Sequence, residues 1–265
     1  MWESIRQTLP LAGLLLALGA SSALADTDTA AGAYDRGDYK KAFAELSQLA
    51  EQGDMVAQHN LAILYDRGRG TSENDAKAAR WYRASAEQGY VLAQYALAAM
   101  YARGEGVKEN DVEAVRWYRA AAEQGHAGAV NALGACYEHG EGVTQDRAQA
   151  ARSYRAAAEQ GFAPAQHNLA RLYAGGEGIA LDLDEAARWY QAAAEQGLAE
   201  AQYALGLLYE SGRGVERDIA VAKHWFQAAA DQGHTDAEKA LSRLEARSST
   251  APSVSVSQVS AEPPN

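Results

Sequence analysis

The chain has little of what characterises several classes of protein. One cysteine, Cys136, occurs in 265 residues, so no intramolecular disulfide can form. Proline occurs only five times, which favours helix because proline interrupts it. The formal net charge is −11, because Asp and Glu outnumber Lys and Arg by 35 to 24. A chain this acidic is a poor candidate for binding nucleic acid or anionic membranes, and we expect neither partner.

Signatures of catalysis are also missing. None of the six histidines lies three or four residues from another, and neither His-Glu-x-x-His nor Cys-x-x-Cys occurs. The repeated Gly-x-Gly pairs lack the third glycine and the preceding strand of a phosphate-binding loop. A pair of acidic side chains for acid/base chemistry would have to assemble from distant segments. We therefore predict no enzymatic activity, no metal and no cofactor.

What the chain has is a repeat. Glycine closes each copy of a stretch best seen as GEGVKENDVEAVRWYRAAAEQG at 104–125, and successive closing glycines are 36 residues apart. They are Gly53, Gly89, Gly125, Gly161, Gly197 and Gly233. A fixed period in this range is typical of a solenoid, in which each unit buries its apolar face against its neighbours.

Each full repeat predicts two helices, named helix A and helix B here. Ala93, Leu97, Ala98 and Tyr101 share one face of helix A, and Gly104 is placed to end it in a left-handed conformation. Helix B follows a column of residues that favour helix N-termini: Asn74, Asn110, Asp146, Asp182 and Asp218.

Helix B carries two further columns. Tryptophan recurs as Trp81, Trp117, Trp189 and Trp225, and Ser153 breaks the column in the third repeat. We expect these indoles to pack between repeats, rather than to form a ligand cage. Arginine and glutamate lie four residues apart as Arg83/Glu87 and Arg119/Glu123, which predicts solvated pairs within helix B.

The N-terminus predicts export. Leu9–Ala20 is an apolar run of 12 residues, and Ala23-Leu24-Ala25 is a small-x-small cleavage site. The run is shorter than the roughly 20 residues that span a bilayer, although an uncleaved anchor is the alternative. We expect residues 1–25 to be a signal peptide cut after Ala25, giving a periplasmic or secreted protein without membrane insertion.

The remaining boundaries follow from the period. Residues 26–53 look like an atypical N-terminal capping repeat, with a brief helix over 30–36. The five full repeats are 54–89, 90–125, 126–161, 162–197 and 198–233. A C-terminal capping helix is expected over 234–247 and a disordered tail over 248–265.

The repeat pattern resembles a known family. A-x-x-x-L-A/G-x-x-Y-x-x-G-x-G-V, a helix cap, and then A-x-x-W-Y-x-x-A-A-x-x-G is similar to the Sel-1-like repeat, a relative of the tetratricopeptide repeat. The resemblance implies a right-handed α-solenoid of antiparallel helix pairs, and a bacterial adaptor or scaffold. One secreted branch has paired cysteines in each repeat and binds β-lactams. With Cys136 alone, this chain departs from that branch.

The resemblance also suggests where a partner binds. In tetratricopeptide arrays the side of helix A opposite the core lines a concave groove, and moving two residues along a helix reaches that side. The residues there vary in character between repeats, which is also what ordinary solvent exposure produces. One column holds planar, hydrogen-bonding side chains suited to a peptide: His59, Tyr95, Asn131, His167 and Tyr203. The predicted partner-binding residues are His59, Tyr95, Arg103, Asn131, His139, His167, Arg171, Tyr203 and Leu207.

These observations favour a monomeric, non-enzymatic periplasmic scaffold that binds a protein or peptide partner in its concave groove. Regulation of signalling and envelope assembly are both compatible with that role. The alternative is an envelope enzyme acting on peptidoglycan or a β-lactam.

Overall fold

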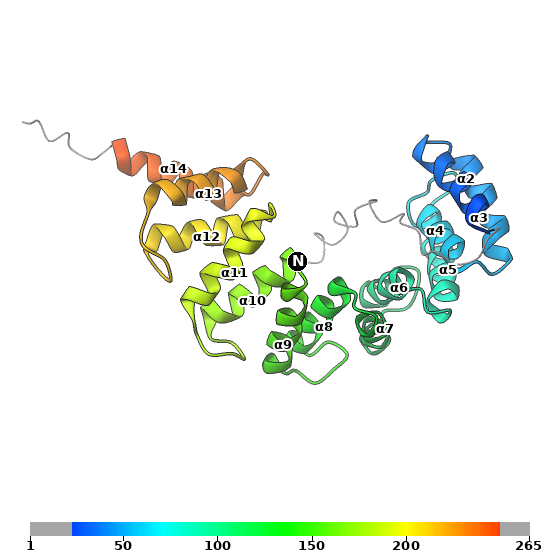
Figure 1. The fold of residues 1–265 in the computed structure, drawn as a ribbon, viewed down its shortest axis with the longest axis horizontal. Coiled ribbons are helices and arrows are strands. Elements are labelled where there is room, and N and C mark those ends of the chain that lie inside the picture. Colours follow the sequence, from blue (N-terminus) through cyan, green and yellow to red (C-terminus); the bar gives the residue numbers. More distant parts are fainter. Residues whose placement is uncertain (1–22, 250–265) are drawn as a thin grey trace, which may run out of the picture. The chain divides into compact units, whose positions relative to one another are not determined.

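The computed structural model of the protein describes residues 23–249, and every regular element in that range is an α-helix. Successive helices lie side by side as hairpins (Figure 1), which confirms the all-α solenoid. The A helices are α4 (Met55–Asp66), α6 (Val91–Arg103), α8 (Ala127–His139), α10 (Ala163–Gly175) and α12 (Ala199–Ser211). The B helices are α5 (Asp75–Glu87), α7 (Asp111–Glu123), α9 (Arg147–Glu159), α11 (Leu183–Glu195) and α13 (Ile219–Ala230).

The chain forms two compact units that divide at Ala156, within α9. In the first, α2 (Ala23–Asp35) and α3 (Tyr39–Glu51) precede the repeats, and in the second α14 (Thr235–Ser249) follows them. Among the described residues, no helix is both long and apolar enough to cross a membrane.

Both terminal helices differ from the sequence-based boundaries. The predicted helix over 30–36 is too short, because α2 begins at Ala23 and buries Ala30 and Ala33 fully. At the other end α14 continues to Ser249, two residues into the predicted tail. The rest of that tail, at 250–265, and the first 22 residues of the predicted signal peptide lie outside the described residues.

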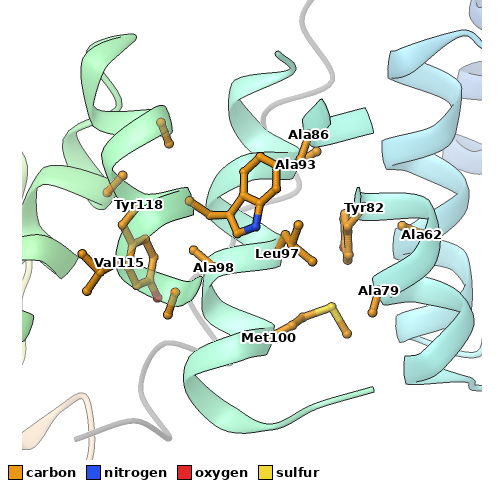
Figure 2. Packing of buried hydrophobic residues seen from close by; sticks show 14 of the residues in the cluster. Ala62, Ala79, Tyr82, Ala86, Ala93, Leu97, Ala98, Met100, Val115 and Tyr118 are labelled. Atoms are coloured by element: carbon orange, nitrogen blue, oxygen red, sulfur yellow. The ribbon is translucent and has the colours of Figure 1, made fainter. Parts of the chain in front are cut away.

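The core consists of alanines, leucines and one large ring from each B helix. In Figure 2, Leu97 of α6 lies between Tyr82 of α5 and Tyr118 of α7, and all three are buried. Each fully buried leucine contributes about 1.5–3 kcal/mol by removal from water. Small residues set the helix spacing, because an added Cβ at Gly134 would lie 2.6 Å from the Tyr154 ring. The alanine columns therefore let the helices approach closely around their rings.

In four of the five full repeats, the Gly-x-Gly loop contacts the repeat before it. Gly104 ends α6 in the left-handed region with φ of 67°, as predicted, and its N–H donates to the Met100 carbonyl. Gly106 has φ of 65°, and a Cβ there would lie 2.1 Å from the carbonyl oxygen of Asp75, at the start of the preceding helix B. Gly70, Gly142 and Gly214 make the same approach to Tyr39, Asp111 and Leu183. The second glycine therefore allows contact between two backbones.

The predicted cap column is confirmed at the start of the B helices. The Asn110 side chain accepts a hydrogen bond from the Glu113 N–H at 3.1 Å, and Asp182 accepts one from Glu185 at 3.0 Å. Asp146 accepts one from the Gln149 N–H at 2.9 Å. Each bond satisfies a backbone donor that has no partner inside its helix.

Replacing Asp146 with alanine is expected to lower the free energy of unfolding by about 1 kcal/mol, the usual contribution of an N-cap side chain. Urea unfolding followed by circular dichroism measures it. Asp146→Asn keeps a capping oxygen and is the matched control, which should unfold close to wild type. Equal stability of the alanine and asparagine variants would show that the cap contributes nothing.

Candidate protein-binding face

The column of planar side chains on helix A packs across the boundary between repeats. In the first unit the His59 ring lies 5.4 Å from the Tyr82 ring, in the same repeat, and 5.1 Å from Tyr90 in the next. Tyr95 lies 5.8 Å from Tyr118 and 4.6 Å from His126 in the same arrangement. His59 is only 8% exposed and Tyr95 is half-buried. The structure thus gives these rings a packing role that the sequence did not predict.

The second unit repeats this geometry. The rings of His167 and Tyr190 are 5.4 Å apart, and Tyr203 lies 5.7 Å from Phe226. Tyr203 also stacks on His234, with ring centroids 4.6 Å apart and planes at 28°. In each case the ring on helix A bridges to the helix B ring of its own repeat. Removing such a ring would disturb packing as well as any contact with a partner.

Two histidines in this column are uncharged at neutral pH. The Nδ1 atoms of His59 and His167 are buried, and neither has a hydrogen-bond partner within the described residues. Burial lowers the pKa of His59 to about 4. Burial also lowers the pKa of His167; Glu200 opposes that shift and the positive charge of Arg171 adds to it. A buried charge without a partner is costly, so both rings stay neutral.

The other predicted residues are more accessible. Arg103 is half-buried and its Nε donates to Glu105 Oε2 at 2.7 Å. Burial raises the pKa of Tyr95, and the positive charge of Arg103 opposes that shift. His139 is exposed at the end of α8, and Asn131 is half-buried earlier on that helix. Arg171 is half-buried on α10. These residues supply charge and hydrogen-bonding groups on the A helices.

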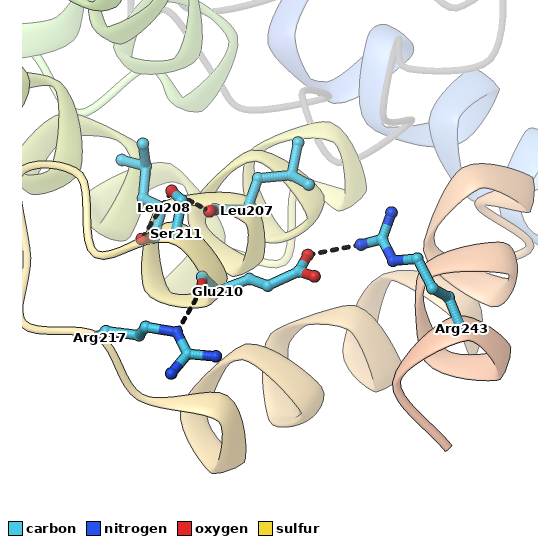
Figure 3. A network of polar contacts seen from close by, with 6 residues as sticks. All are labelled: Leu207, Leu208, Glu210, Ser211, Arg217 and Arg243. Carbon is cyan, nitrogen blue, oxygen red and sulfur yellow. Dashed lines mark hydrogen bonds and ion pairs between the residues drawn. The ribbon is translucent and has the colours of Figure 1, made fainter. Parts of the chain in front are cut away.

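Polar contacts fix the end of α12 beside the predicted residue Leu207 (Figure 3). Arg243 of α14 donates to Glu210 Oε2 at 2.5 Å, and Arg217 Nε donates to the Glu210 carbonyl at 3.1 Å. Ser211 Oγ donates to the Leu207 carbonyl at 2.7 Å. Leu207 itself is half-buried against the core formed with α13 and α14. Helix α14 therefore contributes the charged side chain of Arg243 to the end of α12 at which Leu207 lies.

A glutamine network joins neighbouring repeats, and sequence reasoning missed it. Gln94 is 6% exposed, and its Nε2 donates to the Ala86 carbonyl of the preceding helix B at 3.2 Å. Gln124, at the end of helix B, donates to Gln94 Oε1 at 2.8 Å. The same pairs are Gln58–Gln88, Gln166–Gln196 and Gln202–Gln232. The signal was visible as two glutamine columns 30 residues apart, with Val130 interrupting one of them.

The expected arginine–glutamate pairs on helix B take a different form. Arg83 Nη2 donates to the Tyr101 hydroxyl of the next repeat at 2.6 Å, and Arg119 Nη2 donates to the Tyr137 hydroxyl at 3.3 Å. The phenol of the following helix A lies within reach of each guanidinium. These arginines therefore connect repeats, rather than only stabilising one helix.

Cys136 is buried on α8, as its place in a leucine column predicts. Burial raises the pKa of its thiol to about 12, so the thiol remains protonated. Within 23–249, no three His, Cys, Asp or Glu side chains cluster closely enough to hold a metal ion.

Comparison with known proteins agrees with the geometry. The family model described as Sel1 repeat matches five segments: 56–90, 91–126, 127–162, 163–198 and 199–234. No curated protein sequence matches the chain.

Solved structures are also similar. A Sel1 repeat protein from Oxalobacter formigenes is 35% identical with a TM-score of 0.76, over 82% of this chain and 86% of that one. A protective antigen of uropathogenic Escherichia coli with an SLR fold is 34% identical with a TM-score of 0.71, over 78% of this chain. The match covers only 44% of the antigen's own length. The immunity protein PA5088 from Pseudomonas aeruginosa is 25% identical with a TM-score of 0.55, over 84% of this chain and 85% of that one.

Proposed function

Because this chain belongs to the Sel1 repeat family, we propose that it is a non-enzymatic scaffold that binds a protein or peptide partner through the outward side of its A helices. Proteins built from Sel1 repeats are generally protein-interaction scaffolds. The apolar run and small-x-small site within residues 1–25 support a periplasmic or secreted location. One solved structure with a similar fold is described as an immunity protein.

The observation that carries the proposal is the contrast between the two sides of helix A. The inward side keeps alanine and leucine in every full repeat, as at Ala93 and Leu97. The outward side places charged side chains near packed rings. Burial raises the pKa of Tyr95 and Arg103 opposes that shift, whereas burial lowers the pKa of His167 and Arg171 adds to that shift. Rings held rigidly by packing lose little side-chain entropy on binding, and they favour contact with a partner.

The test targets charge, because truncating a packed ring would also cost stability. Once the partner has been identified by in-cell cross-linking, Arg171→Glu is expected to weaken it about 30-fold, the scale of a 2 kcal/mol hot-spot loss. Arg188→Glu makes the same change of charge on α11 at an exposed site of the same unit, paired there with Glu185. That control should bind within about twofold of wild type, since surface substitutions away from a contact change little. If Arg188→Glu weakened partner binding more than Arg171→Glu, the binding site would not lie on the A helices.

A further inference from the structure

Histidine rings pack at two consecutive boundaries between repeats in the first unit. His59 of α4 lies between Tyr82 of its own repeat and Tyr90 of the next, with ring centroids 5.4 and 5.1 Å away, respectively. His126 lies at the following boundary, where its ring is 4.6 Å from that of Tyr95. Both boundaries therefore depend on an imidazole ring packed against tyrosine.

Both positions suit a neutral ring. His59 Nδ1 is buried and has no hydrogen-bond partner within the described residues. His126 is the N-cap residue of α8, where its Nδ1 and its carbonyl oxygen share the Ala129 N–H at 3.1 and 2.9 Å. A proton on that Nδ1 would point at the N–H donor, and its charge would face the positive end of the helix dipole. Burial lowers the pKa of His126, and a backbone hydrogen bond opposes that shift.

In the part of the chain that the structure describes, no carboxylate acts on either ring. Two tyrosines face His59; burial and, after it, Asp54 raise the pKa of one of them, but Asp54 does not contribute at His59. Tyr95 faces His126; burial raises the pKa of Tyr95, and the charge that opposes this shift belongs to a cation, Arg103. A proton at either boundary therefore lacks a counter-charge, which makes it costly.

The second unit has the same kind of boundary with a carboxylate beside it. His234 Nδ1 accepts a hydrogen bond from the Ala237 N–H at 3.3 Å, and its ring stacks on that of Tyr203. Asp236 follows two residues later. A hydrogen bond from Lys239 lowers the pKa of Asp236, and the charge of His234 adds to that shift. A protonated ring at this boundary therefore has a negative charge nearby.

The first unit has no room for that carboxylate. Gly128 corresponds in register to Asp236, and a Cβ at Gly128 would lie 3.0 Å from the neighbouring histidine ring. The other histidine boundary of the second unit is also partly balanced. Burial lowers the pKa of His167, and Glu200 opposes that shift more strongly than Arg171 adds to it. The two units thus differ in the cost of taking up a proton.

We propose that the first unit is an acid sensor: as the pH falls from 7 to 5, the repeat boundaries at His59 and His126 open, while the boundary at His234 stays closed. Opening would expose tyrosine rings that are packed at neutral pH. Attraction between a cation and a tyrosine ring is present at all of these boundaries, so it does not remove the difference between the units. The inference concerns contacts between repeats and does not depend on the proposed function.

Hydrogen exchange of the full chain at pH 7 and pH 5, corrected for the intrinsic effect of pH and measured by mass spectrometry, tests the proposal. The pKa of His59 is about 4 in the folded chain and about 6.5 in an unfolded one, so His59 alone should lower the protection of α4 by about 20-fold. Helix α12, whose Tyr203 stacks on His234, should lose less than about fivefold. Equal losses in α4 and α12 would overturn the proposal.

Two variants assign the effect to the histidines and to the carboxylate. His59→Tyr combined with His126→Asn replaces both rings by groups that stay neutral, and asparagine remains a good N-cap. In this double variant α4 should lose less than about threefold. Asp236→Asn removes the charge beside His234 and should increase the loss in α12 at least about threefold. A 20-fold loss in α4 that persists in the double variant, or an unchanged acid response of α12 in Asp236→Asn, would contradict the proposal.

Discussion

Replacing Gly106 with alanine is expected to destabilise the protein by about 4 kcal/mol. The new Cβ would lie 2.1 Å from the Asp75 carbonyl oxygen, and neither backbone has a flexible side chain to move aside. Overpacking costs about 1–3 kcal/mol and occasionally more, and the left-handed conformation at φ of 65° adds roughly 1–2 kcal/mol for any residue with a Cβ. Urea unfolding followed by circular dichroism measures the loss.

Gly125→Ala is the matched control for this experiment. Gly125 also has a positive φ, of 83°, but an added Cβ would meet no atom within 4 Å. Its substitution should therefore cost only the conformational part, about 1–2 kcal/mol. If both variants lose the same stability, the close approach between the loop and the preceding helix B does not limit the fold.

Acidification is expected to destabilise the first unit through His59. The pKa of His59 is about 4 in the folded chain, whereas an unfolded chain has the ordinary value of about 6.5. The stability that the folded chain has with a neutral His59 ring is fully present above pH 6.5. It is lost progressively as the pH falls from 6.5 toward 4. A depression of this size corresponds to about 3 kcal/mol at its full extent.

His59→Tyr is the matched variant, because Tyr95 and Tyr203 occupy the same register in other repeats. Melting temperatures of wild type and variant are compared at intervals from pH 7 to pH 4. The wild type should lose more stability than the variant over this range. Parallel curves would show that His59 takes up its proton without any cost to the fold.

The repeat explains why so much of the fold could be predicted. Five copies fix the columns that face inward, the caps such as Asp146, and the loop glycine Gly104, because each position recurs in the same local environment. A resemblance carried by five copies in phase leaves few other folds to consider. The terminal helices were less predictable. Helix α2 lies outside the five full repeats, so its sequence has no set of equivalent copies with which it can be compared.

The candidate site was harder to predict, because helix periodicity does not say how far a side chain reaches into the next repeat. His59 lies on the side of α4 opposite Leu61, and yet Tyr82 and Tyr90 cover it. Gln94 is also buried, and its side chain donates a hydrogen bond to a carbonyl of the preceding helix B. Contacts between repeats join residues from 8 to 35 positions apart, as in Gln94–Ala86 and Gln124–Gly89, and only the structure brings them together.

The proposed function requires a protein partner to contact the outward side of the A helices. Its most direct test is a photo-crosslinking amino acid introduced in cells at Arg171, on α10, and in a separate variant at Arg188, on α11. Both are in the second unit and both replace an arginine. We expect a discrete adduct to another protein from position 171 and none from position 188. An adduct from position 188 alone, or none from position 171 when the protein is present at its normal level, would contradict it.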